Sequence, residues 1–203
     1  PETVRPVETL SALSGKTAPG RTPEFTSAHV LIALRIIREK SPGRKQLSAA
    51  LCLGEGTVRN LLRRLAEEGL VSSTRRGVSL TAKGEDLVEE LTQHIRGRPV
   101  PRSNMTVGEY NHAVLVKGGA SKVRLGVEQR DHALISGASG ATTLVFEDGG
   151  LKVPALPNVV EESIAESIME LGPEAGDAVV IGTADSVFFA ELGAYVAGLE
   201  LLS

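Results

Sequence analysis

Residues 56–91 of this 203-residue chain read GTVRNLLRRLAEEGLVSSTRRGVSLTAKGEDLVEEL. The first half of the stretch predicts an amphipathic helix over about residues 55–68, because apolar side chains recur there at i, i+3, i+4 and i+7. These side chains are Val58, Leu61, Leu62 and Leu65. Gly69 suits the C′ position that ends such a helix, with Leu70 packing back behind it.

The second half of the stretch predicts a basic hairpin and another helix. Two short strand-like runs flank the turn Arg75-Arg76-Gly77. Thr81 is then placed to cap an amphipathic helix over about residues 82–95.

Two further helices are predicted upstream of the quoted stretch. Ser27 can cap a helix that runs to about Lys40, and the run SPG at 41–43 ends it. A short helix follows over about residues 44–51, and Gly54 lies in the tight connection after it. The order helix, helix, turn, helix, basic hairpin, helix is that of the winged helix-turn-helix domain.

The net charge of −3 hides an uneven distribution along the chain. Residues 26–102 carry fourteen Lys and Arg against eight Asp and Glu, whereas residues 103–203 carry five against fourteen. A basic half joined to an acidic half indicates two tasks, one of them involving a polyanion, although random drift of charge between two domains is an alternative. The predicted organisation is an extended N-terminal arm at 1–25, a winged helix-turn-helix domain at 26–97, a proline-containing linker at 98–106 and an acidic α+β domain for sensing or dimerisation at 107–203.

The basic side chains of the first domain gather on one predicted face. The apolar stripe of helix 55–68 must face the core, so the opposite side is free to enter a DNA major groove, where side chains reach base edges. The N-terminal turn of that helix, with Thr57, Arg59 and Asn60, is expected to point at bases, and the arginines one turn later are expected closer to phosphates. The hairpin tip can reach a neighbouring minor groove or the backbone, and the start of helix 44–51 lies beside phosphates. The predicted DNA-binding residues are Arg44, Lys45, Thr57, Arg59, Asn60, Arg63, Arg64, Arg75 and Arg76. The alternative is a solvated charged surface on a winged helix that contacts proteins.

The acidic half predicts a two-layer α+β domain. Strands are expected at 113–117, 142–147, 151–153 and 178–181, a hairpin turn at 148–150, and helices over about 121–134, from Asn158 to about Leu171, and from Ser186 onward. The last helix has a second side of small residues, namely Ala190, Gly193, Ala194 and Ala197. Such a side predicts close packing on a sheet or on a second subunit.

The runs GVEQRDHA at 126–133 and SGASGATT at 136–143 suggest a small-molecule site. The small-residue loop offers backbone N–H groups and hydroxyls that could hold an anion, but it matches neither a Walker loop nor a dinucleotide fingerprint. The candidate ligand-binding residues are Arg130, Asp131, Thr142 and Thr143. The alternative is a surface Arg–Asp pair beside a tight turn, because neighbouring helical residues point about 100° apart and cannot all face one site.

Several phrases carry a family resemblance. Residues 56–91, including LTAKG at 80–84 after the hairpin, resemble the recognition helix, wing and following helix of prokaryotic winged-helix regulators. A second set of phrases is PEFTSAH at 23–29, QRDHA at 129–133, GATTL at 140–144 and the closing strand–helix pair. With them the chain resembles an uncharacterised archaeal family of winged helix-turn-helix proteins with a GAD-like C-terminal domain. The resemblance implies a transcriptional regulator. Similar GAD domains are inserted in bacterial aspartyl-tRNA synthetases and tRNA-dependent amidotransferases, but the resemblance supplies no ligand or catalytic residue.

The function expected from these patterns is a DNA-binding transcriptional regulator, a homodimer on double-stranded DNA whose acidic domain binds a small-molecule effector or dimerises. One alternative is an RNA- or tRNA-linked binding protein, against which stand an aromatic content of 3% and the acidic second half. Another is a small enzyme fused to a winged helix, like biotin ligases or archaeal riboflavin kinases. No catalytic constellation or Gly-rich nucleotide loop is visible, so we expect no enzymatic activity.

The sequence also bears on disulfides, metals, cofactors and membrane association. The single cysteine, Cys52, allows neither a disulfide framework nor a cysteine-based zinc site within one chain, and no cofactor or metal is expected. No apolar run approaches the roughly 18–20 residues that span a bilayer. We therefore expect no membrane association and a cytoplasmic location.

Overall fold

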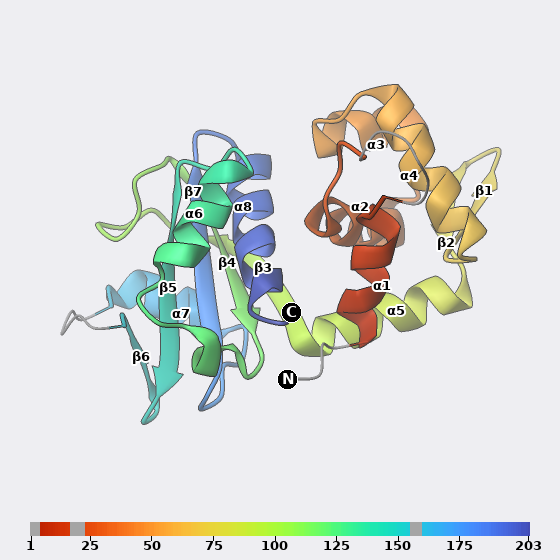
Figure 1. The fold of residues 1–203 in the computed structure, drawn as a ribbon. Coiled ribbons are helices and arrows are strands. Elements are labelled where there is room, and N and C mark those ends of the chain that lie inside the picture. The colour runs from red at the N-terminus through yellow and green to blue at the C-terminus, as the bar shows by residue number, and fades with distance from the viewer. Residues whose placement is uncertain (1–4, 17–22, 155–159) are drawn as a thin grey trace. The chain divides into compact units, whose positions relative to one another are not determined.

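In a computed structural model, the chain is an α+β protein whose contacts separate it into two compact units, residues 1–92 and 93–203 (Figure 1). The structure describes residues 5–16, 23–154 and 160–203. The first unit consists of helices and a two-stranded hairpin, and the second contains a five-stranded sheet with helices. The α+β class expected from the sequence is confirmed.

The N-terminal segment contains a helix where the sequence predicted an extended arm. Helix α1 (Arg5–Ser14) buries Val7, Leu10 and Leu13, and it packs on α2 (Ser27–Lys40). The three-residue spacing of these apolar side chains is the signal that could have revealed α1. Positions 1–4 and 17–22 of the predicted arm lie outside the described residues.

The central elements of the first unit follow in the predicted order. They are α2, α3 (Arg44–Leu51), α4 (Glu55–Glu67), β1 (Val71–Thr74), β2 (Gly77–Leu80) and α5 (Ala82–His94). Strands β1 and β2 pair antiparallel and form the wing. This part of the chain is therefore a helix-turn-helix followed by a wing, as the sequence predicted.

Local hydrogen bonds explain why α4 ends and α5 begins where they do. Gly69 has a φ of 70° and donates its N–H to the Ala66 carbonyl, while the Leu70 N–H reaches back to Leu65. The Thr81 hydroxyl accepts from the Gly84 N–H at 3.1 Å. The predicted C′ glycine of α4 and threonine cap of α5 are both confirmed.

The second unit is built on one antiparallel sheet. Its strands are β3 (Ile95–Val100), β4 (Tyr110–Val116), β5 (Gly140–Glu147), β6 (Gly150–Lys152) and β7 (Ala178–Ala184), arranged β3-β4-β7-β5-β6. The β5–β6 turn is formed by Asp148 and Gly149, both with positive φ, which is the geometry of a two-residue hairpin. The predicted hairpin at this point is confirmed.

Strand β3 corrects the predicted linker at 98–106. Helix α5 ends at His94 and β3 begins at the next residue, so positions 98–100 lie in a strand. Pro99 favoured a linker in the sequence because proline cannot donate a ladder hydrogen bond. It is tolerated here because β3 is the edge strand of the sheet that the described residues form, with β4 as its neighbour.

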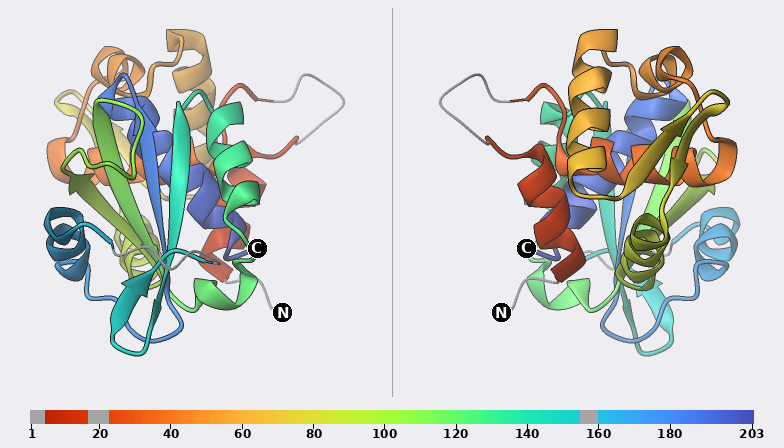
Figure 2. Two further views of the ribbon diagram at one scale, coloured as in Figure 1. Left: turned by 90° about the vertical axis from the view of Figure 1, so that its left-hand side faces the viewer. Right: turned by 90° about the vertical axis from the view of Figure 1, so that its right-hand side faces the viewer.

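Helices cover both faces of the sheet (Figure 2). Alternate strand residues such as Leu115 and Ile181 share an apolar cluster with Ile164 and Ile168 of α7 (Glu162–Met169). On the other face lie α6 (Val127–Ile135) and α8 (Val187–Glu200), which pack on each other as well as on strands. The unit thus has three layers where the sequence predicted two.

Helices α6 and α7 differ in extent from the sequence prediction. The predicted helix 121–134 is instead a short 3-10 turn, η1 (Gly119–Lys122), followed by α6. Helix α7 starts at Glu162, and its predicted cap, Asn158, lies outside the described residues.

The small-residue side of α8 packs within the fold. Ala190, Ala194 and Ala197 are at most 1% exposed. A Cβ on Gly182 of β7 would lie 2.2 Å from the Ala190 carbonyl oxygen, so α8 approaches the sheet backbone closely. Of the two outcomes predicted for this side, packing on a sheet is the observed one.

Candidate nucleic-acid interface

A groove of about 610 Å³ runs between α4 and the wing of the first unit. The start of α3 supplies one side, a stripe of α4 another, and the hairpin from Ser73 to Val78 the third. Five arginines line it: Arg44, Arg59, Arg63, Arg75 and Arg76. The stripe of α4 also includes Leu62 and Ala66. Leu62 was predicted to lie in the core, but it borders the groove and is only partly buried.

The wing is fixed to the helices by its second strand. The Val78 N–H donates to the Pro42 carbonyl at 3.0 Å, in the turn between α2 and α3. Gly77 has a φ of 134°, and a Cβ there would lie 2.1 Å from the Ser41 carbonyl oxygen. Only glycine fits this position, so the width of the groove depends on a residue that the sequence marked only as a turn.

The groove arginines differ in their partners. Arg44 pairs with Glu55 at 3.4 Å, and Arg63 pairs with Glu67 at 2.5 Å. Arg59, Arg75 and Arg76 form no ion pair with any residue in the described part of the chain. Three cationic groups thus line a concave surface and have no counter-ion among the residues that the structure describes, which favours binding of a polyanion.

Arg64 is a correction to the predicted DNA contacts. Its side chain is buried, and its Nη1 donates to the carbonyl oxygens of Leu13 at 2.8 Å and Gly15 at 2.6 Å. The guanidinium also lies 5.7 Å from the centre of the Phe25 ring. Arg64 therefore holds the end of α1 against α4 and faces away from the groove, about 100° around the helix from Arg63.

Three other predicted contacts lie outside the groove lining. Lys45 is exposed on α3. Thr57 donates its hydroxyl to Glu24 at 3.0 Å, and Asn60 accepts from Arg63 at 2.9 Å. The structure thus assembles five of the nine predicted residues in one groove and leaves Thr57 and Asn60 near the start of α4.

The groove also contains residues that the sequence did not single out. Gln46, Ser73 and Thr74 line it with the arginines. The Thr74 hydroxyl accepts from the Arg76 N–H at 3.2 Å and so orders the wing tip. No local pattern distinguishes these polar residues from others on the surface, because their role depends on the approach of the wing to α3 and α4.

The candidate ligand site of the second unit is not assembled. Arg130 and Asp131 are exposed on α6 and contact each other at 3.6 Å. Thr143 is buried on the face of β5 next to α6, whereas Thr142 points to the other face and donates to the Met105 carbonyl at 2.7 Å. The alternative interpretation, a surface pair, describes Arg130 and Asp131.

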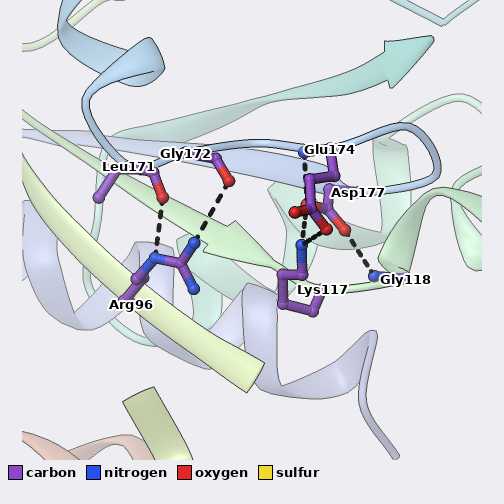
Figure 3. Close-up of polar contacts among 7 residues, drawn as sticks. All are labelled: Arg96, Lys117, Gly118, Leu171, Gly172, Glu174 and Asp177. Carbon is purple, nitrogen blue, oxygen red and sulfur yellow. Dashed lines mark hydrogen bonds and ion pairs between the residues drawn. The ribbon is translucent and has the colours of Figure 1, made fainter. Parts of the chain in front are cut away.

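A buried carboxylate in the second unit has a structural role (Figure 3). Burial raises the pKa of Asp177, but hydrogen bonds from the Gly118 and Glu174 N–H groups and from Lys117 outweigh it, so this pKa lies below its usual value. A hydrogen bond to Glu174 raises the pKa of Lys117. The cluster is satisfied internally and ties the start of β7 to the end of β4.

Arg96 makes a second internal link in the same region (Figure 3). From the edge strand β3 it donates to the carbonyl oxygens of Leu171 at 2.8 Å and Gly172 at 3.3 Å. This arginine therefore secures the chain after α7 to the sheet.

Within residues 5–16, 23–154 and 160–203, no group of three His, Cys, Asp or Glu side chains is arranged to hold a metal ion. No helix among those residues is long and apolar enough to cross a bilayer.

Each of the two units matches a known protein family. Residues 28–86 match the family described as PH0730-like, N-terminal domain, and residues 107–201 match a domain of unknown function, DUF4443. The solved structure of hypothetical protein PH0730 from Pyrococcus horikoshii OT3 is 30% identical, with a TM-score of 0.74 over 88% of this chain and 93% of that one. The chain belongs to the PH0730-like family.

Other comparisons add little to this PH0730-like assignment. A structure of a mutant of S. aureus MepR bound to an oligodeoxyribonucleotide is 27% identical over 32% of this chain and 53% of that one, with a TM-score of 0.28. No curated protein matches. Neither matching family is described as a GAD domain, so the GAD-like resemblance of the second unit of this PH0730-like protein stays a prediction.

Proposed function

We propose that this protein is a DNA-binding transcriptional regulator, and that the groove between α4 and the wing follows one strand of a DNA duplex. The observation that carries the proposal is the set of five arginines lining that groove. A helix with one polar face fits the major groove, and a neighbouring wing then reaches the adjoining backbone or minor groove. The groove lies between α4 and the wing, and in the proposed complex the phosphates of one strand pass along it.

The positions of the side chains support separate proposed roles within the interface. Arg59, Arg75 and Arg76, which have no counter-ion in the described chain, are proposed phosphate contacts. Arg63 is a further proposed phosphate contact, because it lines the same groove and its pair with Glu67 is exposed. Thr57 and Asn60 lie near the start of α4, outside the groove, and are the proposed base contacts. Arg59 thus moves from the base-reading role that the sequence favoured to backbone binding.

We further propose a binding protein without enzymatic activity that acts as a homodimer in the cytoplasm. A single winged helix contacts one half-site, and pairing two across a pseudo-palindrome is the usual source of affinity in such regulators. No effector is assigned, because Arg130, Asp131, Thr142 and Thr143 do not converge.

The test measures affinity for a labelled DNA duplex by fluorescence anisotropy over a series of salt concentrations. Arg59→Ala or Arg75→Ala should weaken binding to any sequence and reduce the slope of log K against log salt by about 0.9, the value for one lost phosphate contact. Arg124→Ala, which removes an exposed charge from the second unit, is the control and should leave the slope unchanged.

Two results would count against the proposal. One is an equal loss of affinity in Arg59→Ala and Arg124→Ala. The other is tighter binding of a duplex RNA of the same sequence, because the deep, narrow major groove of A-form RNA does not admit a helix.

A further inference from the structure

Helix α6 has an unusual outer face. Gln129 and Ala133 point into the fold and are buried, whereas Val127 and Leu134 are 43% and 45% exposed and Ile135 is 85% exposed. Among the described residues, eight large apolar side chains are exposed, and four of them lie between Leu125 and Ile135. A cluster of this kind on a soluble domain marks an interaction surface.

Two charged residues lie in the middle of this apolar face. Val127, Arg130, Asp131 and Leu134 have the spacing i, i+3, i+4, i+7, so they form one stripe along the outside of α6. Arg130 and Asp131 are 54% and 58% exposed, and their only ion pair in the described chain is the loose 3.6 Å contact with each other. The order along the stripe is apolar, positive, negative, apolar.

We propose that α6 is the surface through which two copies of this chain associate, with the two helices antiparallel about a two-fold axis between Arg130 and Asp131. In such a pair, residues at equal distances on either side of the axis face each other. Arg130 then faces Asp131 of the partner subunit, and Val127 faces Leu134 of the partner subunit. The stripe is therefore complementary to itself in both charge and apolarity.

The charge order also selects this arrangement over its alternatives. A parallel pair in register would place Arg130 against a second Arg130 and Asp131 against a second Asp131, and like charges facing each other across an interface are repulsive. The charges along the stripe are complementary to the same charges in reverse order, and a partner of another kind does not require this self-complementarity. A second copy of the chain is the occupant that matches it.

Residues of α8 beside α6 can extend the contact. The Phe189 ring lies 3.0 Å from the position of a Cβ on Gly137, directly after α6, and Val187 at the start of α8 is 56% exposed. A nine-residue helix alone buries less than the roughly 800 Å² per subunit of a standard interface, so this neighbouring apolar surface is part of the proposed contact.

The role of the proposed α6 surface, which is to bring two winged helices to one operator, depends on the proposed function. The association of two chains through α6 does not depend on it. Association is measured on the full chain without DNA, by sedimentation and light scattering over a range of concentrations. A failure here therefore leaves the groove proposal intact, and a failure of DNA binding leaves the α6 surface intact.

The decisive experiment is a charge exchange. Arg130→Asp alone or Asp131→Arg alone places like charges across the axis, and each should raise the dimer dissociation constant by at least about tenfold. The double variant Arg130→Asp plus Asp131→Arg restores opposite charges and should return the constant to within about threefold of the original. Both positions are exposed, so the variants should fold.

Met169→Asp, on the exposed side of α7, is the matched control and should dimerise like the original chain. The α6 surface is refuted by a chain that stays monomeric at high concentration. It is also refuted by single variants that dimerise unchanged, or by a double variant that is not rescued.

Discussion

Arg63 and Arg64 are neighbours on α4 with opposite roles, so a matched pair of substitutions separates folding from DNA binding. Replacing Arg64 by Met keeps the length of the apolar stem and removes the guanidinium. Two hydrogen bonds to the Leu13 and Gly15 carbonyls are lost. Each such charged hydrogen bond contributes about 1.5–3 kcal/mol, but the cost of burying the guanidinium is also relieved.

The net loss for Arg64→Met should be about 2–4 kcal/mol in the free energy of unfolding of the first unit. For a unit of 92 residues, a loss of about 3 kcal/mol lowers Tm by about 12–24 °C. Arg63→Met breaks the ion pair with Glu67 and the hydrogen bond to Asn60. The Arg63 and Glu67 side chains are both more than half exposed, so these contacts lie at the surface. The effect of Arg63→Met on the free energy of unfolding should stay within about 0.5 kcal/mol.

DNA binding should follow the reverse order. Arg63→Met should weaken binding and reduce the salt slope by about 0.9, whereas Arg64→Met should leave both unchanged at a temperature where the variant is folded. Stability is measured by urea unfolding followed by circular dichroism, and binding by anisotropy of a labelled duplex. An Arg64→Met protein of normal stability, or one that is folded but loses a phosphate contact, would refute the assignment of Arg64 to the core.

Two further perturbations test the packing of the first unit. Burial lowers the pKa of His29 from 6.5 to about 4, so the unfolded chain takes up a proton first on acidification. The free energy of unfolding should fall by about 1.4 kcal/mol per pH unit between pH 6.5 and 4, and His29→Gln should flatten that dependence in urea titrations at several pH values; an unchanged slope would remove His29 as the cause. Gly77→Ala should push the wing off the Ser41 carbonyl, weakening DNA binding and lowering Tm, whereas Gly149→Ala, at a positive φ with open space, is strained but should leave DNA affinity intact. Equal DNA affinity in the two glycine variants would show that the groove does not depend on the wing position.

Much of the fold could be predicted because its signals are local. The apolar spacing in α4, the glycine at its end and the Thr81 cap each depend on a few adjacent residues, and the structure has all three. The hairpin at Asp148 and Gly149 is likewise set by residues that accept positive φ. Such features are visible in the sequence because the interactions that form them span only a few residues.

The sequence predictions were wrong for elements that depend on partners far away in the chain. Strand β3 contains Pro99, and this proline made the segment look like a linker in the sequence. In the structure the segment pairs with β4 and forms the edge of the sheet, where a proline is tolerated. Helix α1 was hidden because a proline- and glycine-rich segment follows it, although its three buried side chains have helical spacing. Both elements exist because other parts of the chain cover or pair them.

The sequence by itself determined the order of the elements in the first unit and the gathering of positive charge there, because periodicity, capping and composition are properties of short segments. Tertiary structure decided which charges face outward. It buried Arg64 beneath α1 and left Arg63 in the groove, and it turned the small-residue side of α8 inward while leaving the outer face of α6 exposed. Adjacent helical residues differ by about 100° in direction, and only the packing of distant segments fixes which direction meets solvent.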